Sequence, residues 1–324
     1  MNKKKIFVWC CDLNKNSGEG IIANKFIHDL KLNNSSHKLI INSPKNKSEN
    51  IFVERFIHPL RGLIFLWKIY IFNKNINICY VNYLPFWNFI LFLLLPPKTI
   101  LGPITGGSLF NKKPVKNYIL RKYFLNTLNN LTILVIKIRG SKLLFSTDLL
   151  KNKLYKNRKY LFNYILKDFK IKKIKKYKKK YDLIFYLRDH KNKNMKMQID
   201  LANKLSKKFK IITVGEKIPN PDIKNLGYIK RKNLLKILKK TKFAFLSPEN
   251  LLSLFALDSI GCNTNIFFNK NKNYKTNKLK GIFYVNYEDG SKLNHEIEKY
   301  LVKKFVFRIK YINSKEKFEN YFKI

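Results

Sequence analysis

Residues 243–268 read FAFLSPENLLSLFALDSIGCNTNIFF, and this stretch decides the fold class. A short apolar run at 243–246 is followed by a longer segment at 251–260 with the length of a helix, and then by a second short run at 265–268. Strands that alternate with helices of this size form parallel βαβ units. The stretch therefore predicts a parallel sheet with helices packed on its faces.

The same alternation extends outward to both ends of the chain. Before residue 243 it predicts, in the second half, strands at 183–187 and 210–214 and helices at 195–208 and 231–240. In the first half it predicts strands at 6–9, 39–41, 76–81 and 99–101 and helices at 21–30, 63–72 and 86–95. We therefore expect an α/β protein with two Rossmann-like doubly wound parallel-sheet domains that face each other across a cleft, where ligands bind at the carboxyl ends of the strands.

A lysine block separates the two halves. Residues 170–180 read KIKKIKKYKKK, and a new strand begins directly afterwards. Such a block marks a domain junction, and it is either a solvated linker or a patch for anionic membranes. We expect an N-terminal domain at 1–175, a C-terminal domain at 176–310, and a helix at 311–324 that can pack back on the N-terminal domain.

The composition indicates a globular and strongly basic protein. Of 324 residues, 67 are Lys or Arg and 20 are Asp or Glu, which gives a formal charge of +47. The 45% of apolar residues are enough to bury sizeable cores, so disorder of most of the chain is excluded. The charge reflects either the codon bias of an A/T-rich genome or an anionic partner.

Two further features concern the cellular compartment. The four cysteines lack CxxC spacing, which indicates a reducing compartment and no metal site. The first apolar run ends at Asp12, too early for the hydrophobic region of a signal peptide. The stretch at 86–95 is about half as long as a membrane span. It is therefore either a buried helix or a helix that dips into a membrane.

Two acidic residues belong to the region of the predicted helix at 251–260, one just before it and one within it. Glu249 falls at the turn before the helix, where it either faces the cleft or complements the helix dipole. Asp258 lies in an otherwise apolar segment. A carboxylate there is either buried with a partner or directed at a ligand hydroxyl such as that of a ribose. The helix N-terminus near Asn250 favours a phosphate.

Two cations follow the predicted strand at 183–187. Arg188 and Lys193 stand at its carboxyl end, where they can straddle a diphosphate, Arg as a planar fork and Lys as a point charge. Arg188 carries more of this argument because arginine is scarce in this lysine-rich chain. His190 between them is either a solvated loop residue or a catalytic base.

The first half has two glycine-containing turns after predicted strands. Ser17-Gly18-Glu19-Gly20 is either a plain tight turn or a site that presents Glu19 to the hydroxyls of an acceptor. Residues 101–108 read LGPITGGS, and such a glycine-rich loop lets the backbone approach a ligand. Neither turn carries the GxGxxG or P-loop pattern, so a standard dinucleotide or Walker site is not supported.

Residues 247–264 resemble the donor signature of the retaining glycosyltransferases with two Rossmann-like domains, the GT-B type, within the broad group-1 or family-4 class. In that signature a Ser and a Glu precede a helix that carries a second acid. Arg188 and Lys193 resemble the pair that binds the donor diphosphate, and Gly215-Glu216 resembles the glycine turn beside the donor base. Residues 227–229 are similar to the segment before the base-binding helix, and residues 102–107 look like a loop of some polysaccharide glycosyltransferases.

The resemblance assigns a role to each candidate residue. The catalytic group is Glu249, Arg188 and Lys193. The donor-binding group is Gly215, Glu216, Asn250 and Asp258. The candidate acceptor-binding group, taken from the two turns of the first half, is Gly18, Glu19, Gly20, Thr105, Gly106 and Gly107.

The resemblance implies transfer of a sugar from a nucleotide-diphosphate donor, such as a UDP- or GDP-sugar, to a hydroxyl of a glycan or lipid-linked acceptor. It implies no cofactor and no obligatory metal. From the charge we expect a cytoplasmic enzyme, held on the inner face of the plasma membrane by anionic lipid and active in surface polysaccharide synthesis. The alternatives are an inactive protein of this fold and a nucleic-acid-binding protein. The aromatic residues argue against the latter, because they lie in apolar runs rather than among the basic segments.

Overall fold

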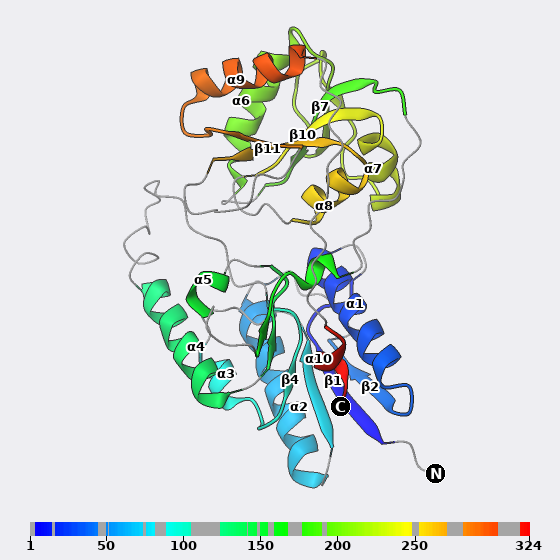
Figure 1. Ribbon diagram of the computed structural model, residues 1–324, viewed down its shortest axis with the longest axis vertical. Coiled ribbons are helices and arrows are strands. Elements are labelled where there is room, and N and C mark those ends of the chain that lie inside the picture. Colours follow the sequence, from blue (N-terminus) through cyan, green and yellow to red (C-terminus); the bar gives the residue numbers. More distant parts are fainter. Residues whose placement is uncertain are drawn as a thin grey trace. The chain divides into compact units, whose positions relative to one another are not determined.

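The computed structural model of the protein describes residues 4–14, 17–44, 50, 52–73, 76–81, 89–104, 124–140, 142–147, 150–154, 159–167, 177–189, 193–247, 253–270, 281–303 and 318–324. The chain divides into two compact units (Figure 1). Unit 1 comprises Met1–Asp168 with Ser314–Ile324, and unit 2 comprises Phe169–Asn313. This boundary and the one that the sequence predicts after residue 175 both fall outside the described ranges.

Unit 1 is built on a parallel sheet with the strand order β2-β1-β3-β4. Its strands are β1 (Lys5–Cys10), β2 (Lys38–Asn42), β3 (Asn77–Val81) and β4 (Ile100–Leu101). A second parallel pair, β5 (Leu143–Leu144) and β6 (Tyr160–Leu161), continues beyond β4 through a bridge between Ile104 and Phe145. The helical segments are α1 (Gly18–Asn33), η1 (Val53–Ile57), α2 (His58–Phe72), α3 (Phe89–Leu94), α4 (Leu125–Arg139), α5 (Lys151–Leu154), η3 (Tyr164–Leu166) and α10 (Glu319–Phe322).

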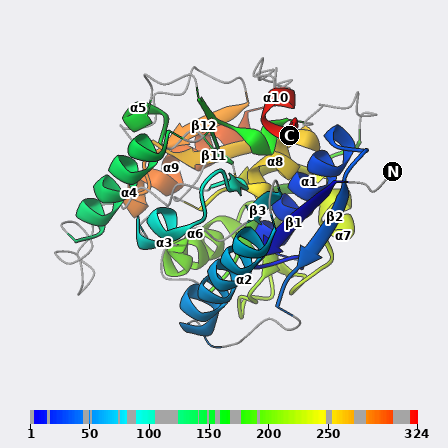
Figure 2. The same cartoon turned by 90° about the horizontal axis from the view of Figure 1, so that it is seen from below.

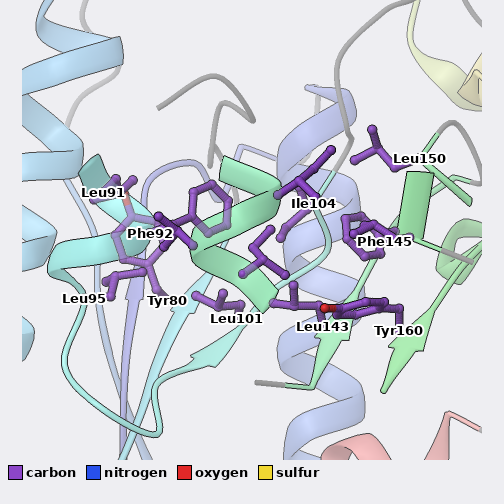
Figure 3. Close-up of a cluster of buried hydrophobic side chains, with 14 of the residues drawn as sticks. Tyr80, Leu91, Phe92, Leu95, Leu101, Ile104, Leu143, Phe145, Leu150 and Tyr160 are labelled. Atoms are coloured by element: carbon purple, nitrogen blue, oxygen red, sulfur yellow. The ribbon is translucent and has the colours of Figure 1, made fainter. Parts of the chain in front are cut away.

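Helices cover both faces of this sheet. Successive strand residues point to opposite faces, so Val8 of β1 packs in a core with α1 and α10, whereas Trp9 packs in a core with α2, α3 and α4. Figure 3 shows part of this second core, where Phe92 of α3 lies close to Tyr80 of β3. Neighbouring strand residues are therefore buried on both sides, which is why the strands read as continuous apolar runs.

The segment at 318–324 completes unit 1. Phe318, Tyr321 and Phe322 are buried in the core that α1 forms with the sheet. The buried side chain of Asn34, directly after α1, donates a hydrogen bond to the carbonyl of Phe322 and accepts one from the backbone N–H of Ile324. Residues distant in sequence thus share one hydrophobic core.

Unit 2 is a parallel sheet with the strand order β12-β11-β10-β7-β8-β9. Its strands are β7 (Tyr181–Leu187), β8 (Ile211–Gly215), β9 (Lys224–Asn225), β10 (Thr241–Phe245), β11 (Asn265–Asn269) and β12 (Ile282–Val285). Its helices are α6 (Met195–Ser206), α7 (Arg231–Leu238), α8 (Leu254–Gly261) and α9 (Gly290–Val302). As Figure 1 shows, α6 and α9 lie on one face and α7 and α8 on the other.

The predicted fold class is confirmed, since both units are α/β with parallel doubly wound sheets. The predicted strands and helices that fall in the described ranges are present with shifted ends. The elements that were not predicted are η1, α4, β5, α5, β6, η3, β9, β12 and α9. In the apolar stretch at 86–95, Leu91 and Phe92 are buried. Within the described ranges, the helices lack the combined length and apolarity needed to cross a bilayer.

Arg139 joins α4, which was not predicted, to α3, which was. From the last turn of α4, its Nη1 donates to the carbonyls of Phe92, Leu93 and Leu95 at 2.8–2.9 Å. Its Nη2 donates to the carbonyl of Pro96 at 2.9 Å. The last carbonyls of a helix have no partner within the helix, so this one guanidinium caps α3.

We predict that Arg139→Met lowers the free energy of unfolding of unit 1 by about 2 kcal/mol, because several carbonyls lose a charged donor. Arg139→Lys should lose less, since an ammonium reaches fewer of them. Urea unfolding followed by tryptophan fluorescence measures this, because all three tryptophans stand at positions 9, 67 and 87, within unit 1. The exposed neighbour Lys137→Met is the control, and equal urea midpoints for the two Met variants would contradict the capping role.

Candidate functional site

The strand order of unit 2 fixes where a ligand can bind. The chain runs from β7 through β8 to β9 on one side of the sheet, then returns to β10 and runs through β11 to β12 on the other. Between β7 and β10 the order reverses, and open α/β sheets bind ligands beyond the carboxyl ends of the strands at such a point. The residues that follow β7 and β10 are therefore the first candidates.

A hydrogen bond spans this switch point. Lys193 follows β7 and Ser247 follows β10, and the Lys193 Nζ donates to the Ser247 Oγ at 3.3 Å. The backbone of Lys193 is held by Gln198 of α6. The fully buried Gln198 side chain donates from Nε2 to the Lys193 carbonyl at 2.7 Å. The ammonium thus has a fixed place at the carboxyl edge.

Arg188 lies at the same edge, directly after the buried Leu187. Its side chain is exposed and close enough to Tyr228 to act on it electrostatically. A hydrogen bond that the Tyr228 hydroxyl donates to Glu216 raises the pKa of Tyr228, and the charge of Arg188 opposes this rise. Arg188, Glu216 and the 67%-exposed Tyr228 thus form one polar group beyond β7 and β8.

Gly215 makes this group possible. It ends β8 with φ +96°, and a Cβ at this position would lie 1.8 Å from the carbonyl oxygen of Leu187. The next residue, Glu216, donates its backbone N–H to that same oxygen at 3.1 Å. Only glycine allows β8 to end this close to β7, so the turn that resembles a donor-base turn has a steric reason for its glycine.

Asp258 is buried with a partner, which is one of the two alternatives that the sequence leaves open. Only 7% of Asp258 is exposed. Arg231, the first residue of α7, donates from Nε to Oδ2 at 2.9 Å and from Nη2 to Oδ1 at 2.6 Å. The hydrogen bonds to Asp258 raise the pKa of Arg231, against the effect of its own burial. This two-pronged pair ties α7 to α8.

In unit 1 the turn before α1 is closed by its own polar groups. Ser17 caps α1 by accepting from the Gly20 N–H at 2.8 Å, and its hydroxyl donates to Asp12 at 2.5 Å. A Cβ on Gly20 would lie 2.1 Å from the carbonyl oxygen of Asn14, so this glycine has a packing role. Gly18 and Glu19 are exposed in the first turn of α1.

Several candidate residues lie outside the described ranges: Glu249, Asn250, His190, Thr105, Gly106 and Gly107. Their predicted roles stay predictions. Four residues that bond to candidate residues were not themselves among the candidates: Gln198, Tyr228, Arg231 and Ser247. For Ser247 and Tyr228 a signal existed, because Ser247 begins the donor-like signature and Tyr228 lies in the segment at 227–229 that resembles the one before the base-binding helix.

The cysteines offer no nucleophile at neutral pH. Burial raises the pKa of Cys11 and of Cys262 to about 11, and it also raises the pKa of Cys10 and of Cys79 well above the ordinary value of a thiol. A thiol with so high a pKa stays protonated and unreactive. Among the described residues there is also no group of three or more His, Cys, Asp or Glu side chains arranged to hold a metal ion.

Comparison with solved structures identifies the fold. A glycosyltransferase from Rickettsia africae matches 92% of this chain over 88% of its own, with a TM-score of 0.51 and 14% identity. The UDP-GlcNAc 2-epimerase of Methanocaldococcus jannaschii, in complex with UDP-GlcNAc and UDP, matches over 96% of both chains with a TM-score of 0.56 and 13% identity. No protein-family model matches the sequence, and no curated protein does either. The chain has a GT-B-like fold of two Rossmann-like domains.

We predict that Arg231→Ala destabilises unit 2 by about 2 kcal/mol, because it leaves the buried carboxylate of Asp258 without its cation. Asp258→Ala should cost less, since the half-exposed Arg231 can turn to water. The double variant should cost less than the sum of the two. Urea unfolding followed by far-UV circular dichroism measures all three variants, and strictly additive losses would show that the pair contributes no coupling.

Proposed function

We propose that the protein is a glycosyltransferase that moves a sugar from a nucleotide-diphosphate donor to a hydroxyl of a glycan or lipid-linked acceptor. The observation that carries this proposal is the cationic edge of unit 2. Lys193 is hydrogen-bonded across the switch point to Ser247, and Arg188 directly follows β7 at the same edge of the sheet. This is the position at which a sheet of this topology binds a nucleotide.

The chemistry of the transfer suits this edge. When the glycosidic bond to the donor breaks, negative charge accumulates on the departing diphosphate. Fixed cations stabilise that charge without having to reorganise during the reaction. Arg188 would hold two diphosphate oxygens with its planar fork, and Lys193 would act as a point charge. No metal is then obligatory, because the two side chains supply the positive charge.

The remaining donor contacts follow from the surrounding residues. The base would lie near Gly215 and Glu216, beside the exposed ring of Tyr228. Each oxygen of Asp258 accepts one hydrogen bond from Arg231 and keeps a lone pair that can accept from a ribose hydroxyl. Glu249 would hold hydroxyls of the transferred sugar, and Asn250 would stand at the helix end that favours phosphate. In a retaining transfer the new glycosidic bond forms on the face of the sugar from which the diphosphate departs.

The acceptor would be bound by unit 1, through Gly18, Glu19, Gly20 and the loop with Thr105, Gly106 and Gly107. A lipid-linked saccharide would place the enzyme at the cytoplasmic face of the plasma membrane and in the synthesis of a surface polysaccharide. The charge of +47 supports this location, since each Lys or Arg near an anionic leaflet contributes about 1 kcal/mol.

A second candidate function is epimerisation of UDP-GlcNAc. The epimerase structure has the higher TM-score of the two neighbours, 0.56 against 0.51, and matches over nearly the full length of both chains. Both candidates bind a nucleotide sugar, so the cationic edge of unit 2 suits either. They differ in whether the sugar needs an acceptor.

The test has two stages. Thermal unfolding with UDP-, GDP- and ADP-sugars identifies the donor, because a ligand at a hundred times its dissociation constant stabilises the fold by about 2.7 kcal/mol. The stabilising sugar is then incubated with and without lipid-linked saccharides and followed by NMR. Acceptor-dependent release of the nucleoside diphosphate supports transfer. A change of sugar configuration without acceptor supports the epimerase, and stabilisation by none of the donors contradicts both.

We predict that Arg188→Ala lowers turnover about a hundredfold, which corresponds to about 3 kcal/mol of lost charge stabilisation. Arg188→Lys should recover only part of it, because an ammonium lacks the planar fork. Steady-state kinetics with the identified donor measures both. Lys236→Ala, an exposed cation on α7 of the same unit, is the control and should leave turnover unchanged. Full activity of Arg188→Ala would move the diphosphate elsewhere.

A further inference from the structure

Most of the exposed large apolar side chains among the described residues lie on three helices of unit 1: α2, α3 and α4. On α2 they include Tyr70 and Phe72 near its end and a row of four, Leu60, Ile64, Trp67 and Ile71, which recur every three or four residues and therefore share one side of the helix. Leu63 and Leu66 of the same helix are buried in the core. Thus α2 is apolar on both its buried and its exposed sides.

The two neighbouring helices repeat this arrangement. On α3, Ile90, Leu93 and Leu94 are exposed while Leu91 and Phe92 are buried. On α4, Leu131, Leu134 and Ile138 are exposed while Ile133 and Ile136 are buried. A helix at an ordinary protein surface presents polar residues to water, so the outward sides of all three helices are unusual.

These outward sides adjoin one another. The Trp67 Nε1 of α2 donates to the carbonyl of Leu94 of α3 at 2.6 Å. Arg139, next to Ile138 on α4, donates to the carbonyl of Leu93 at 2.9 Å. Figure 2 shows α2, α3 and α4 following one another along one side of unit 1. We call the exposed apolar side chains of these three helices the apolar face.

The segment of the chain that carries the apolar face has side-chain charges of a single sign. Between Glu54 and Asp148 the sequence contains no Asp or Glu, whereas Lys and Arg recur throughout. Arg61 and Lys68 are exposed on α2 and Lys137 on α4, each next to an apolar residue of the face. A partner that covers this face must therefore combine an apolar surface with negative charge.

We propose that the apolar face docks on the surface of an anionic lipid bilayer, with its side chains among the acyl chains and its flanking cations at the lipid phosphates. The inference deepens the membrane location given under the proposed function and rests on it. A second copy of the chain fits poorly, because the same cations would face each other. A nucleic acid would leave the aliphatic side chains without a suitable contact.

The packing of these helices in unit 1 limits which of their side chains can enter the bilayer. They are anchored in the core of unit 1 by Leu66, Phe92 and Ile136, so only their outward sides are available to lipid. A helix in this position lies in the plane of the interface, and its attachment strengthens with both buried apolar area and anionic lipid content. Membrane attachment should therefore need both contributions.

The experiment is sedimentation of the full chain with vesicles of phosphatidylcholine alone or mixed with phosphatidylglycerol. A triple variant, Ile64→Asn, Ile71→Asn and Ile138→Asn, removes side chains that are 61–75% exposed. Its matched control, Leu32→Asn, Ile41→Asn and Val302→Asn, removes side chains that are 44–73% exposed elsewhere. We expect the first variant to lower the partition coefficient on anionic vesicles about tenfold or more, and the control to change it less than about twofold.

A second pair of variants tests the charges. Arg61→Gln, Lys68→Gln and Lys137→Gln together should weaken binding to anionic vesicles by about a hundredfold. The same loss of charge at exposed positions of unit 2, in Lys204→Gln, Lys207→Gln and Lys299→Gln, should have a much smaller effect. Circular dichroism checks that each variant is folded, which is expected since all these side chains are exposed.

Each other outcome overturns the inference. Equal binding of the Asn variant and the native chain to anionic vesicles would mean that the positive field alone attaches the protein. No binding of the native chain would exclude membrane docking, and equal binding to neutral vesicles would exclude the role of the cations. A native dimer that the Asn variant dissociates would assign the face to a second copy. Donor binding, measured by thermal unfolding of the same samples, tests the transferase proposal separately.

Discussion

Both sheets are buried on both faces, and this constraint shapes the rest of the molecule. In β1, Val8 and Trp9 enter different cores, and in β7, Ile184 and Phe185 do the same. No strand interior can then hold a polar group without a cost. Within β8 the buried Thr213 meets this cost with a hydrogen bond to Asn225. Charged groups stand near the strand ends, and Arg188, Lys193 and Ser247 all follow strands at the carboxyl edge of unit 2.

The same constraint explains how much of the fold the sequence reveals. Strands buried on both faces appear as short apolar runs, and β1, β3, β7, β8, β10 and β11 were all predicted from such runs. Short strands such as β5 give too little signal. Helix α4 was missed: it carries apolar residues on its outward side, which removes the periodicity that marks a surface helix, and it lacks the continuous apolar runs from which α2 and α3 were predicted. Helix α9 has apolar residues at 293, 297 and 301, a spacing that indicates a helix with one buried side.

The candidate site also contains residues that could be proposed from the sequence and residues that could not. Arg188 and Lys193 could be proposed from sequence because their place depends on the strand that precedes them. Arg231 could not, because its partner Asp258 is brought to it by the packing of α7 on α8. The bond between Lys193 and Ser247 likewise depends on the neighbouring positions of β7 and β10. Contacts between elements need the tertiary structure, whereas strand ends are visible in the chain itself.

The return of residues 318–324 to unit 1 has a consequence for biosynthesis. A ribosome completes Phe169–Asn313 before it makes the segment that Asn34 holds and that contributes Phe318, Tyr321 and Phe322 to the core beside α1. During translation domains usually fold in the order in which they emerge. Here the second domain has all of its residues while the first still exposes part of its interior, so the nascent first domain is the one that needs protection from aggregation.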